Sequence, residues 1–274
     1  MGLAPARTRV KSRAGHELTR AEIEAWEEIA CESARLAAAM IRVNLGQVAG
    51  VGLKTSPTDV VTQTDIDSEQ LIRARLLEAT PDAGIIGEEG DHLAPAAPLQ
   101  WIIDPLDGTV NFTYGIPLFA VSIAAAYEGT LVAGAVIDVL RGELFSAGLG
   151  TGARCDGRTI STSVCDSLAG ALVTTGFSYR AELRRVQGDV VGRLLPDVRD
   201  IRCFGSAALQ MCWLADGRID AYYERDTKIW DYAAGALICT EAGAIVELQC
   251  PENDGLVCAA PAGLFEQLRP RVDR

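Results

Sequence analysis

The 274-residue sequence has only two histidines, His16 and His92, and its eight cysteines include no CxxC pair. Zinc sites and dithiol redox centres are built from such residues, so the sequence argues against both. It also lacks a GxSxG nucleophile elbow and a GxxxxGK[ST] phosphate-binding loop, which argues against the enzyme classes that depend on them. We expect the cysteines to be reduced and mostly buried, as in a cytoplasmic protein.

Long apolar runs are missing as well. No apolar h-region follows the N-terminal arginines and no run of 18 apolar residues occurs, so we expect neither a signal peptide nor a membrane span. The net charge of −12 argues against broad binding to nucleic acid or anionic membranes. Residues 1–20 depart from this balance, with five basic residues and one acid. We expect residues 1–18 to form a disordered tail, and an arm that binds RNA or a partner is the alternative.

Apolar residues make up 49% of the chain, which is enough for a large core. Two halves with different patterns are expected, 19–150 and 151–274. In the first half, Thr19 and Glu22 fit the capping box of a helix that runs to about residue 45. A second helix is expected at 64–81. Strands are expected at 58–62 and 84–90, and 118–150 is typical of three antiparallel strands joined by tight turns.

The second half alternates between strands and helices. Strands are predicted at 171–177, 201–205, 219–224, 244–248 and 256–260. Helices are predicted at 180–195, 206–216, 230–242 and 262–270. Such alternation is typical of a layered arrangement, so the fold class is α+β or α/β with stacked layers.

The stretch "QWIIDPLDGTVNF" (100–112) places two acids, Asp104 and Asp107, at the end of an apolar strand. Pro105 disfavours a helical conformation for the residue before it, so a sharp turn is expected there. The turn would point the two carboxylates around a common ion and expose the carbonyl of Leu106 as a further ligand. Gly108 would let a phosphate approach closely, at the start of a short helix.

Other acids also fall at strand ends or helix starts, without histidine or cysteine beside them; they are Asp65, Glu88, Glu89, Glu224 and Asp231. An all-oxygen ligand set suits Mg²⁺, which would relieve the repulsion between clustered carboxylates. Two such ions can bind a phosphate and supply hydroxide from bound water. The alternatives are that "DPLDG" is an ordinary turn and that Asp231 is only a helix cap.

Five stretches together resemble the inositol monophosphatase family in order and spacing; they are "KTSPTDVVTQTD" (54–65), "GEE" (87–89), "WIIDPLDGTVNF" (101–112), "GSAALQMCWLADGRIDAYYE" (205–224) and "WDYAAGALICTEAGA" (230–244). The resemblance covers roughly residues 20–265. It implies an αβαβα sandwich of the sugar-phosphatase type. It also implies a lithium-sensitive phosphomonoesterase that uses two or three Mg²⁺ ions and is usually a homodimer.

The resemblance also implies roles for single residues. The metal ligands would be Glu88, Asp104, Leu106, Asp107 and Asp231. Thr109 and Asp65 would orient the attacking water, with Glu88 as a further catalytic residue and Lys54 in the same pocket. The substrate would contact Leu106, Asp107, Gly108, Thr109, Gly205, Ser206, Ala207, Glu224 and Asp231.

The expected reaction is hydrolysis of a small polyol phosphate, with inositol-1-phosphate as the first choice of substrate. Histidinol phosphate is the alternative, because Glu224 could hold an ammonium as readily as a hydroxyl. A regulatory role in contact with RNA machinery is a third hypothesis. His92 and Glu89 are interpreted as exposed and incidental, and Trp101 and Trp230 as packing residues beside the key acids.

Overall fold

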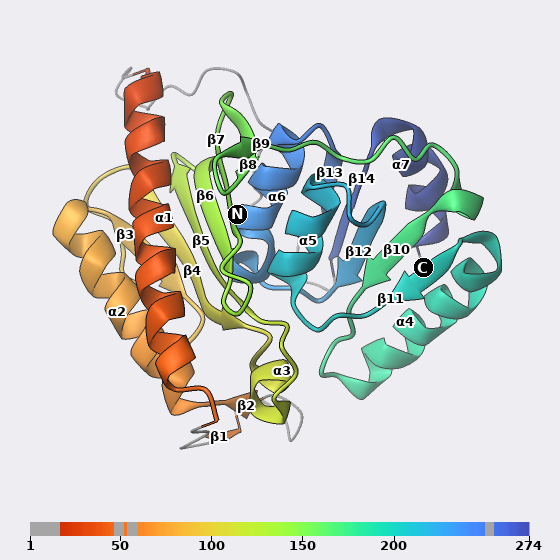
Figure 1. Cartoon of the computed structure of the whole chain (residues 1–274), viewed down its shortest axis with the longest axis horizontal. Helices are drawn as coiled ribbons and strands as arrows, with labels where there is room; N and C mark the ends of the chain where they lie inside the picture. Colours follow the sequence, from red (N-terminus) through yellow and green to blue (C-terminus); the bar gives the residue numbers. More distant parts are fainter. Residues whose placement is uncertain (1–16, 47–51, 54–59, 250–254, 274) are drawn as a thin grey trace.

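The structure is a computed structural model that describes residues 17–46, 52–53, 60–249 and 255–273. It has five layers, in which helices alternate with two β-sheets (Figure 1). This confirms the αβαβα arrangement expected from the sequence. Within the described residues, no helix has both the length and the apolar character needed to cross a membrane.

The first layer consists of α1 (Arg20–Val43) and α2 (Gln63–Ala79), which cover one face of the first sheet. The expected capping box begins α1: the Thr19 side chain accepts from the backbone of Glu22, and the Glu22 carboxylate accepts from the Thr19 N–H at 2.8 Å. Small residues face the sheet, so α1 packs close to it; Ala30, Ala34, Ala37 and Ala38 are fully buried.

The first sheet has seven strands in the order β3-β4-β5-β6-β7-β8-β9. All pairs are antiparallel except β3 with β4. The strands are β3 (Gly84–Gly87), β4 (Leu99–Asp107), β5 (Ala120–Tyr127), β6 (Thr130–Asp138), β7 (Leu144–Gly148), β8 (Gly152–Cys155) and β9 (Arg158–Thr159). Every residue of β5 is buried, because helices cover both faces of the sheet.

The second sheet has five strands in the order β11-β10-β12-β14-β13. Its strands are β10 (Leu172–Thr175), β11 (Asp200–Arg202), β12 (Ala221–Arg225), β13 (Ile245–Leu248) and β14 (Leu256–Ala260). The pairs of β10 with β11 and β12 are parallel, and β14 is antiparallel to both of its neighbours. The outer layer holds α4 (Ala181–Leu194) and α7 (Ala262–Leu268).

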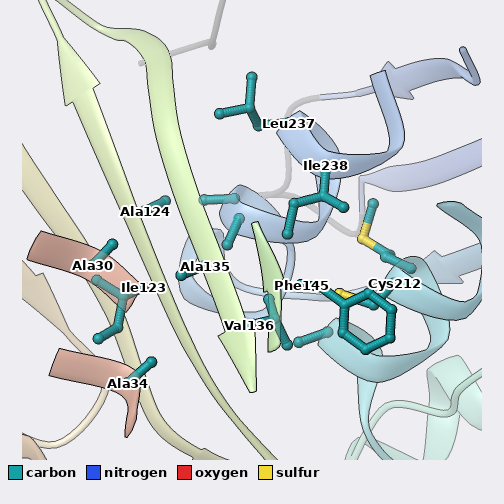
Figure 2. Packing of buried hydrophobic residues seen from close by; sticks show 14 of the residues in the cluster. Ala30, Ala34, Ile123, Ala124, Ala135, Val136, Phe145, Cys212, Leu237 and Ile238 are labelled. Carbon is teal, nitrogen blue, oxygen red and sulfur yellow. The ribbon is translucent and has the colours of Figure 1, made fainter. Parts of the chain in front are cut away.

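The middle layer consists of α5 (Ala207–Ala215) and α6 (Ile229–Glu241), between the two sheets. Every residue of α5 is buried, and so is the middle of α6, from Tyr232 to Cys239. Figure 2 shows Ile238 of α6 and Cys212 of α5 on one side of the first sheet, with Ala30 and Ala34 of α1 on the other. A Cβ on Gly134 would lie 3.1 Å from Cα of Ala234, so α6 packs directly on the backbone of β6.

Most of the expected elements are present within two or three residues of their predicted bounds. Three differences matter. The strand that begins at Leu99 continues to Asp107 instead of ending at Asp104. The strand expected at 58–62 is limited, within the described residues, to β2 (Val60–Val61), and it pairs with a short strand that was not expected, β1 (Gly52–Leu53). Residues 58–59 lie outside the described residues. The first sheet extends past residue 150 through β8 and β9, and the division into two domains near that residue stays a prediction.

Candidate active site

The end of β4 is irregular, and the irregularity aims the two acids. Asp104 pairs with Ser122 of β5 and Asp107 with Ala120, so β4 holds one extra residue between them. Such a bulge is a usual place for a proline inside a sheet, because the proline has no N–H to donate to the ladder. The sharp turn expected at Pro105 is therefore a bulge within a continuing strand. The N–H of Leu106 donates to Oδ1 of Asp104 at 3.1 Å, which fixes that carboxylate.

Asp65 and Thr109 are joined as the sequence predicted. The Thr109 hydroxyl lies 2.8 Å from Oδ1 of Asp65 and 3.0 Å from the carbonyl oxygen of Leu106. It has one hydrogen, and the carboxylate is the stronger acceptor, so the hydrogen is directed to Asp65. The other Asp65 oxygen accepts hydrogen bonds from the N–H and hydroxyl of Thr62. Asp65 is thus fully buried and held by donors on both oxygens.

Asp107 lies against the start of α5, which comes from the other half of the chain. Its Oδ2 accepts from the Ser206 hydroxyl at 2.6 Å and the Ala208 N–H at 2.7 Å, and its Oδ1 accepts from the Ala207 N–H at 3.3 Å. The predicted residues Ser206 and Ala207 are therefore at the site, bound to a predicted ligand carboxylate. Their contact with substrate stays a prediction.

Two glycines allow this approach. Gly108 has φ 100° and Gly205 has φ 76°, a region that other residues rarely adopt. A Cβ on Gly108 would lie 3.1 Å from the carbonyl oxygen of Gly205, so the two predicted turns pack directly together. Asn111 joins them, because its side-chain amide donates to the carbonyls of Leu118 and Phe204 at 2.8 and 2.7 Å.

Asp231 is the third residue of α6, and its Oδ2 accepts the N–H of Lys228 at 2.6 Å. The N-cap of α6 is Lys228, so Asp231 is not the N-cap of the alternative interpretation. Its hydrogen bond from Lys228 is part of a capping box and occupies only one of its oxygens. Oδ2 of Asp104 and Oδ1 of Asp231 accept no hydrogen bond from the described residues. Each carboxylate therefore has one oxygen left for another ligand.

The pKa values show that these acids share a common space. Burial raises the pKa of Asp104 well above its usual value, and the negative charges of Glu88, Asp107 and Asp231 raise it further. Burial and Glu88 also raise the pKa of Asp231. Burial raises the pKa of Asp107 to about 6, against the opposing hydrogen bonds of Ser206 and Ala208. These four acids, which come from β4, from α6 and from the segment after β3, thus repel one another.

The donor set fits a hard divalent cation, since it is made only of oxygen atoms. Among the described residues, however, no three His, Cys, Asp or Glu side chains stand as a ready-made metal cluster. Both oxygens of Asp107 accept hydrogen bonds at the start of α5. The chemistry of the ligands and their mutual repulsion support a metal site, and the ligand set stays a prediction.

Glu224 lies at the end of β12, partly buried, and accepts the Tyr222 hydroxyl at 3.0 Å. Burial raises its pKa to about 8, helped by Asp107 and opposed by the Tyr222 bond. Its carboxylate sits over Gly176, where a Cβ would lie 2.2 Å from Oε1. Gly176 was not predicted from the sequence, and only its position just after a strand hinted at it.

A stripe of polar residues on α2 was also missed. Beyond Asp65, the Ser68 hydroxyl donates to the carbonyl of Pro105 at 2.9 Å, and Glu69 and Arg73 reach the loop that carries Glu88. Positions 65, 68, 69 and 73 follow helical spacing, which places them on one face of the helix. Because these residues share a helix face with Asp65, their spacing in the sequence could have indicated that they lie at the site.

Several predicted residues remain. Lys54 lies outside the described residues, as does most of the basic tail. Trp101 is buried, with its Nε1–H donating to Thr80 at 2.9 Å, so its packing role is confirmed. His92 is exposed, at 6.4 Å between ring centroids from Trp230. The cysteines within the described residues are all free thiols.

The comparisons agree with this geometry. The family model "Inositol monophosphatase family" matches residues 22–270. An inositol-1-monophosphatase of Mycobacterium leprae is 42% identical, over 90% of this chain and 94% of its own length. The chain belongs to the inositol monophosphatase family. It is therefore a phosphatase that acts on phosphoric monoesters.

Other family members show the range of names attached to this fold. The solved structure of Mycobacterium tuberculosis SuhB superposes with a TM-score of 0.80 at 41% identity, covering 91% of this chain and 96% of that one. A Pasteurella multocida protein named Nus factor SuhB is 42% identical over 75% of this chain and 80% of its own length. Members of the inositol monophosphatase family are generally metal-dependent, which fits the oxygen donors gathered at the end of β4.

Proposed function

We propose that the protein hydrolyses inositol-1-phosphate to inositol and phosphate with two or three Mg²⁺ ions. The observation that carries the proposal is the gathering of acids at the end of β4, where burial raises the pKa of Asp104, Asp107 and Asp231 and the nearby charge of Glu88 raises each of them further. Those four carboxylates and the carbonyl of Leu106 would hold the metal. When bound, Mg²⁺ supplies an activated water and neutralises charge on the phosphate and on the leaving oxygen.

The chain's own residues would align that water. Because Thr109 directs its hydrogen to Asp65, its oxygen lone pairs are available to accept a proton from water. Asp65 can then take the threonine proton, while three donors hold it in place. The water oxygen would attack phosphorus in line with the departing alkoxide, and the rigid pair would keep it in that line.

The remaining predicted residues would bind the substrate. Gly108 and Gly205 let their two turns pack together, and the main chain of these turns would contact the phosphate group, with Ser206 and Ala207 beside Asp107. Glu224 would bind the hydroxyls of the polyol. Its raised pKa favours the neutral form at pH 7, and a neutral carboxyl pairs better with a hydroxyl than with an ammonium. This supports inositol-1-phosphate over histidinol phosphate.

The test is phosphate release from inositol-1-phosphate and histidinol phosphate during a Mg²⁺ titration. We expect activity only with divalent metal, a preference for the inositol ester, and inhibition by lithium. Asp104→Asn and Asp231→Asn should each abolish turnover while cooperative unfolding persists. Asp216→Asn, an acid paired with Arg158 and Arg218 far along the chain from the turn, is the matched control and should remain active.

Full activity of either variant, or activity without metal, would reject the mechanism. A preference for histidinol phosphate would reject only the substrate. We also propose a homodimer in the cytoplasm, as the family resemblance implied, and mass measurement in solution tests the dimer.

A regulatory role is the second candidate, because one relative is named a Nus factor and the N-terminal segment is basic. Removing residues 1–18 separates the roles. Retained phosphatase activity with lost RNA binding would assign the second role to the tail, and no RNA binding by the full chain would reject it.

A further inference from the structure

Glu69 of α2 is a buried carboxylate with no role in the proposed reaction. Its side chain is 3% exposed. Oε2 accepts the N–H of Glu89 at 2.7 Å, and Oε1 accepts the N–H of Gly90 at 2.9 Å. The carboxylate therefore binds the main chain directly after Glu88, across 20 and 21 residues of sequence.

Arg73 completes this contact from the next turn of the helix. Its Nε–H donates to Oε1 of Glu69 at 2.7 Å, and its NH2 group donates to the carbonyl of Asp91 at 2.9 Å. The pair thus binds the segment at Glu89, Gly90 and Asp91. Because Arg73 neutralises Glu69, the anchor adds little negative charge to a site where carboxylates already repel one another.

Two glycines in this segment leave space for the Glu69 carboxylate. A Cβ on Gly87 would lie 2.3 Å from Oε1 of Glu69, and a Cβ on Gly90 would lie 2.7 Å from the same atom. Glycines on both sides of the Glu88–Glu89 pair therefore let the carboxylate approach the backbone. A loop held only by surface contacts would not need this space.

We infer that Glu69, supported by Arg73, is a positioning residue that fixes residues 87–91 and so sets where Glu88 stands at the metal site. The inference rests on the proposed function, since it needs Glu88 as a ligand. Glu69 acts through hydrogen bonds to the main chain. A buried carboxylate that holds a ligand loop is needed because the short β3 ends at Gly87, which leaves the loop without ladder hydrogen bonds.

Mg²⁺ binding to the metal-free full chain, measured by isothermal titration calorimetry, tests this role. Glu69→Gln keeps the shape but places an NH2 group against an N–H donor and leaves Arg73 without its anion. We expect Mg²⁺ affinity to fall roughly 10- to 100-fold, as for other residues that orient metal ligands. Turnover should recover towards the wild-type kcat at high Mg²⁺, because Glu69 acts on the position of the ligand. Hydrogen exchange of residues 87–91 should quicken.

Glu27→Gln is the matched control. Glu27 is also buried, and it accepts from the Ser146 hydroxyl at 2.7 Å and from Arg154 at 3.2 Å, on α1 and away from the 87–91 segment. It should lower stability and leave Mg²⁺ affinity unchanged. If Glu69→Gln also lowers only stability, Glu69 is merely structural and the inference is overturned.

Gly90→Ala covers the case in which Glu69→Gln fails to fold. It displaces the carboxylate without removing its charge, at an exposed position, and should weaken Mg²⁺ binding several-fold. An unchanged affinity in this variant would also overturn the inference. A wild-type protein that neither binds Mg²⁺ nor hydrolyses the ester would instead show that the proposed function is wrong.

Discussion

The two flanks of the candidate site hold their carboxylates in different ways. On the α2 flank, side chains of the helix bind the turn after β4: Asp65 binds the Thr109 hydroxyl, and the Ser68 hydroxyl binds the bulge at Pro105. The N–H of Thr62 adds one main-chain hydrogen bond to Asp65. On the α5–α6 flank they are made mainly by main-chain N–H groups at helix starts, which bind Asp107 and Asp231.

This difference determines how many of the contacts on each flank a single substitution removes. A side-chain contact is lost with the side chain, whereas a helix start keeps its N–H groups after most substitutions. Apart from the proposed metal ligands themselves, we therefore expect substitutions on the α2 flank to lower turnover more than substitutions on the α5–α6 flank.

Among residues that are not proposed metal ligands, the largest effect is expected for Asp65→Asn. The amide has nearly the same shape but cannot take a proton from Thr109, so kcat should fall about 10²- to 10³-fold, in the range for general acid–base catalysis. KM and the Mg²⁺ requirement should change little. Asp67→Asn, on the exposed side of the same helix, is the control and should retain its kcat. Steady-state kinetics with kcat within twofold of wild type would remove Asp65 from the proton path.

The two flanks also differ in how many of their site residues could be predicted from the sequence alone. Asp104, Asp107 and Asp231 follow apolar stretches in recognisable motifs, and the Asp65–Thr109 pair came from the family resemblance; the structure joins that pair by a hydrogen bond. Glu69 was missed because an acid four residues before an arginine on a helix is ordinarily a solvated pair. Only the fold shows that this face of α2 is turned inward.

The bulge in β4 and the hydrogen bonds between Asp107 and α5 could not be predicted from the sequence either. The residues that pair across β4 and β5 are set by tertiary packing, and Asp107 meets Ser206 across 99 residues. No local pattern reports such a contact. The helices and strands, by contrast, followed from local periodicity, because the apolar spacing within each element already encodes the face that it buries.

Gly176→Ala tests whether substrate binding by Glu224 depends on the space that Gly176 leaves for its carboxylate. The new Cβ would displace the carboxylate that now lies 2.2 Å from its position. Losing one substrate hydrogen bond costs about 0.5–1.5 kcal/mol, so KM for inositol-1-phosphate should rise about three- to tenfold. Mg²⁺ affinity should not change. Gly188→Ala on α4, where nothing lies within 4 Å of the Cβ, is the matched control. An unchanged KM in Gly176→Ala would show that Glu224 does not contact the substrate.

A smaller effect is expected for Ser206→Ala, on the flank held by main-chain donors. The variant loses the hydroxyl that binds Asp107 and caps α5 at the N–H of Leu209, at a cost of about 1 kcal/mol of unfolding free energy. The Ala208 N–H would still bind Asp107, so kcat should fall far less than in Asp65→Asn. Ser206→Thr keeps the hydroxyl and should restore stability. Denaturant unfolding and kinetics measure both, and a loss of kcat equal to that of Asp65→Asn would contradict the difference between the flanks.

The last prediction concerns stability alone, through the pH dependence of Glu224 in the metal-free protein. Burial raises its folded-state pKa to about 8, from 4.5 for the free group. Between these values the folded protein holds a proton that the unfolded chain releases, so this contribution to stability is complete below about pH 4.5 and declines as the pH rises towards 8. The side chain in Glu224→Gln cannot ionise. The melting temperature of this variant should therefore rise relative to that of the wild type as the pH increases from 5 to 9. A constant difference would mean that Glu224 is already ionised, which would return histidinol phosphate to equal standing as a substrate.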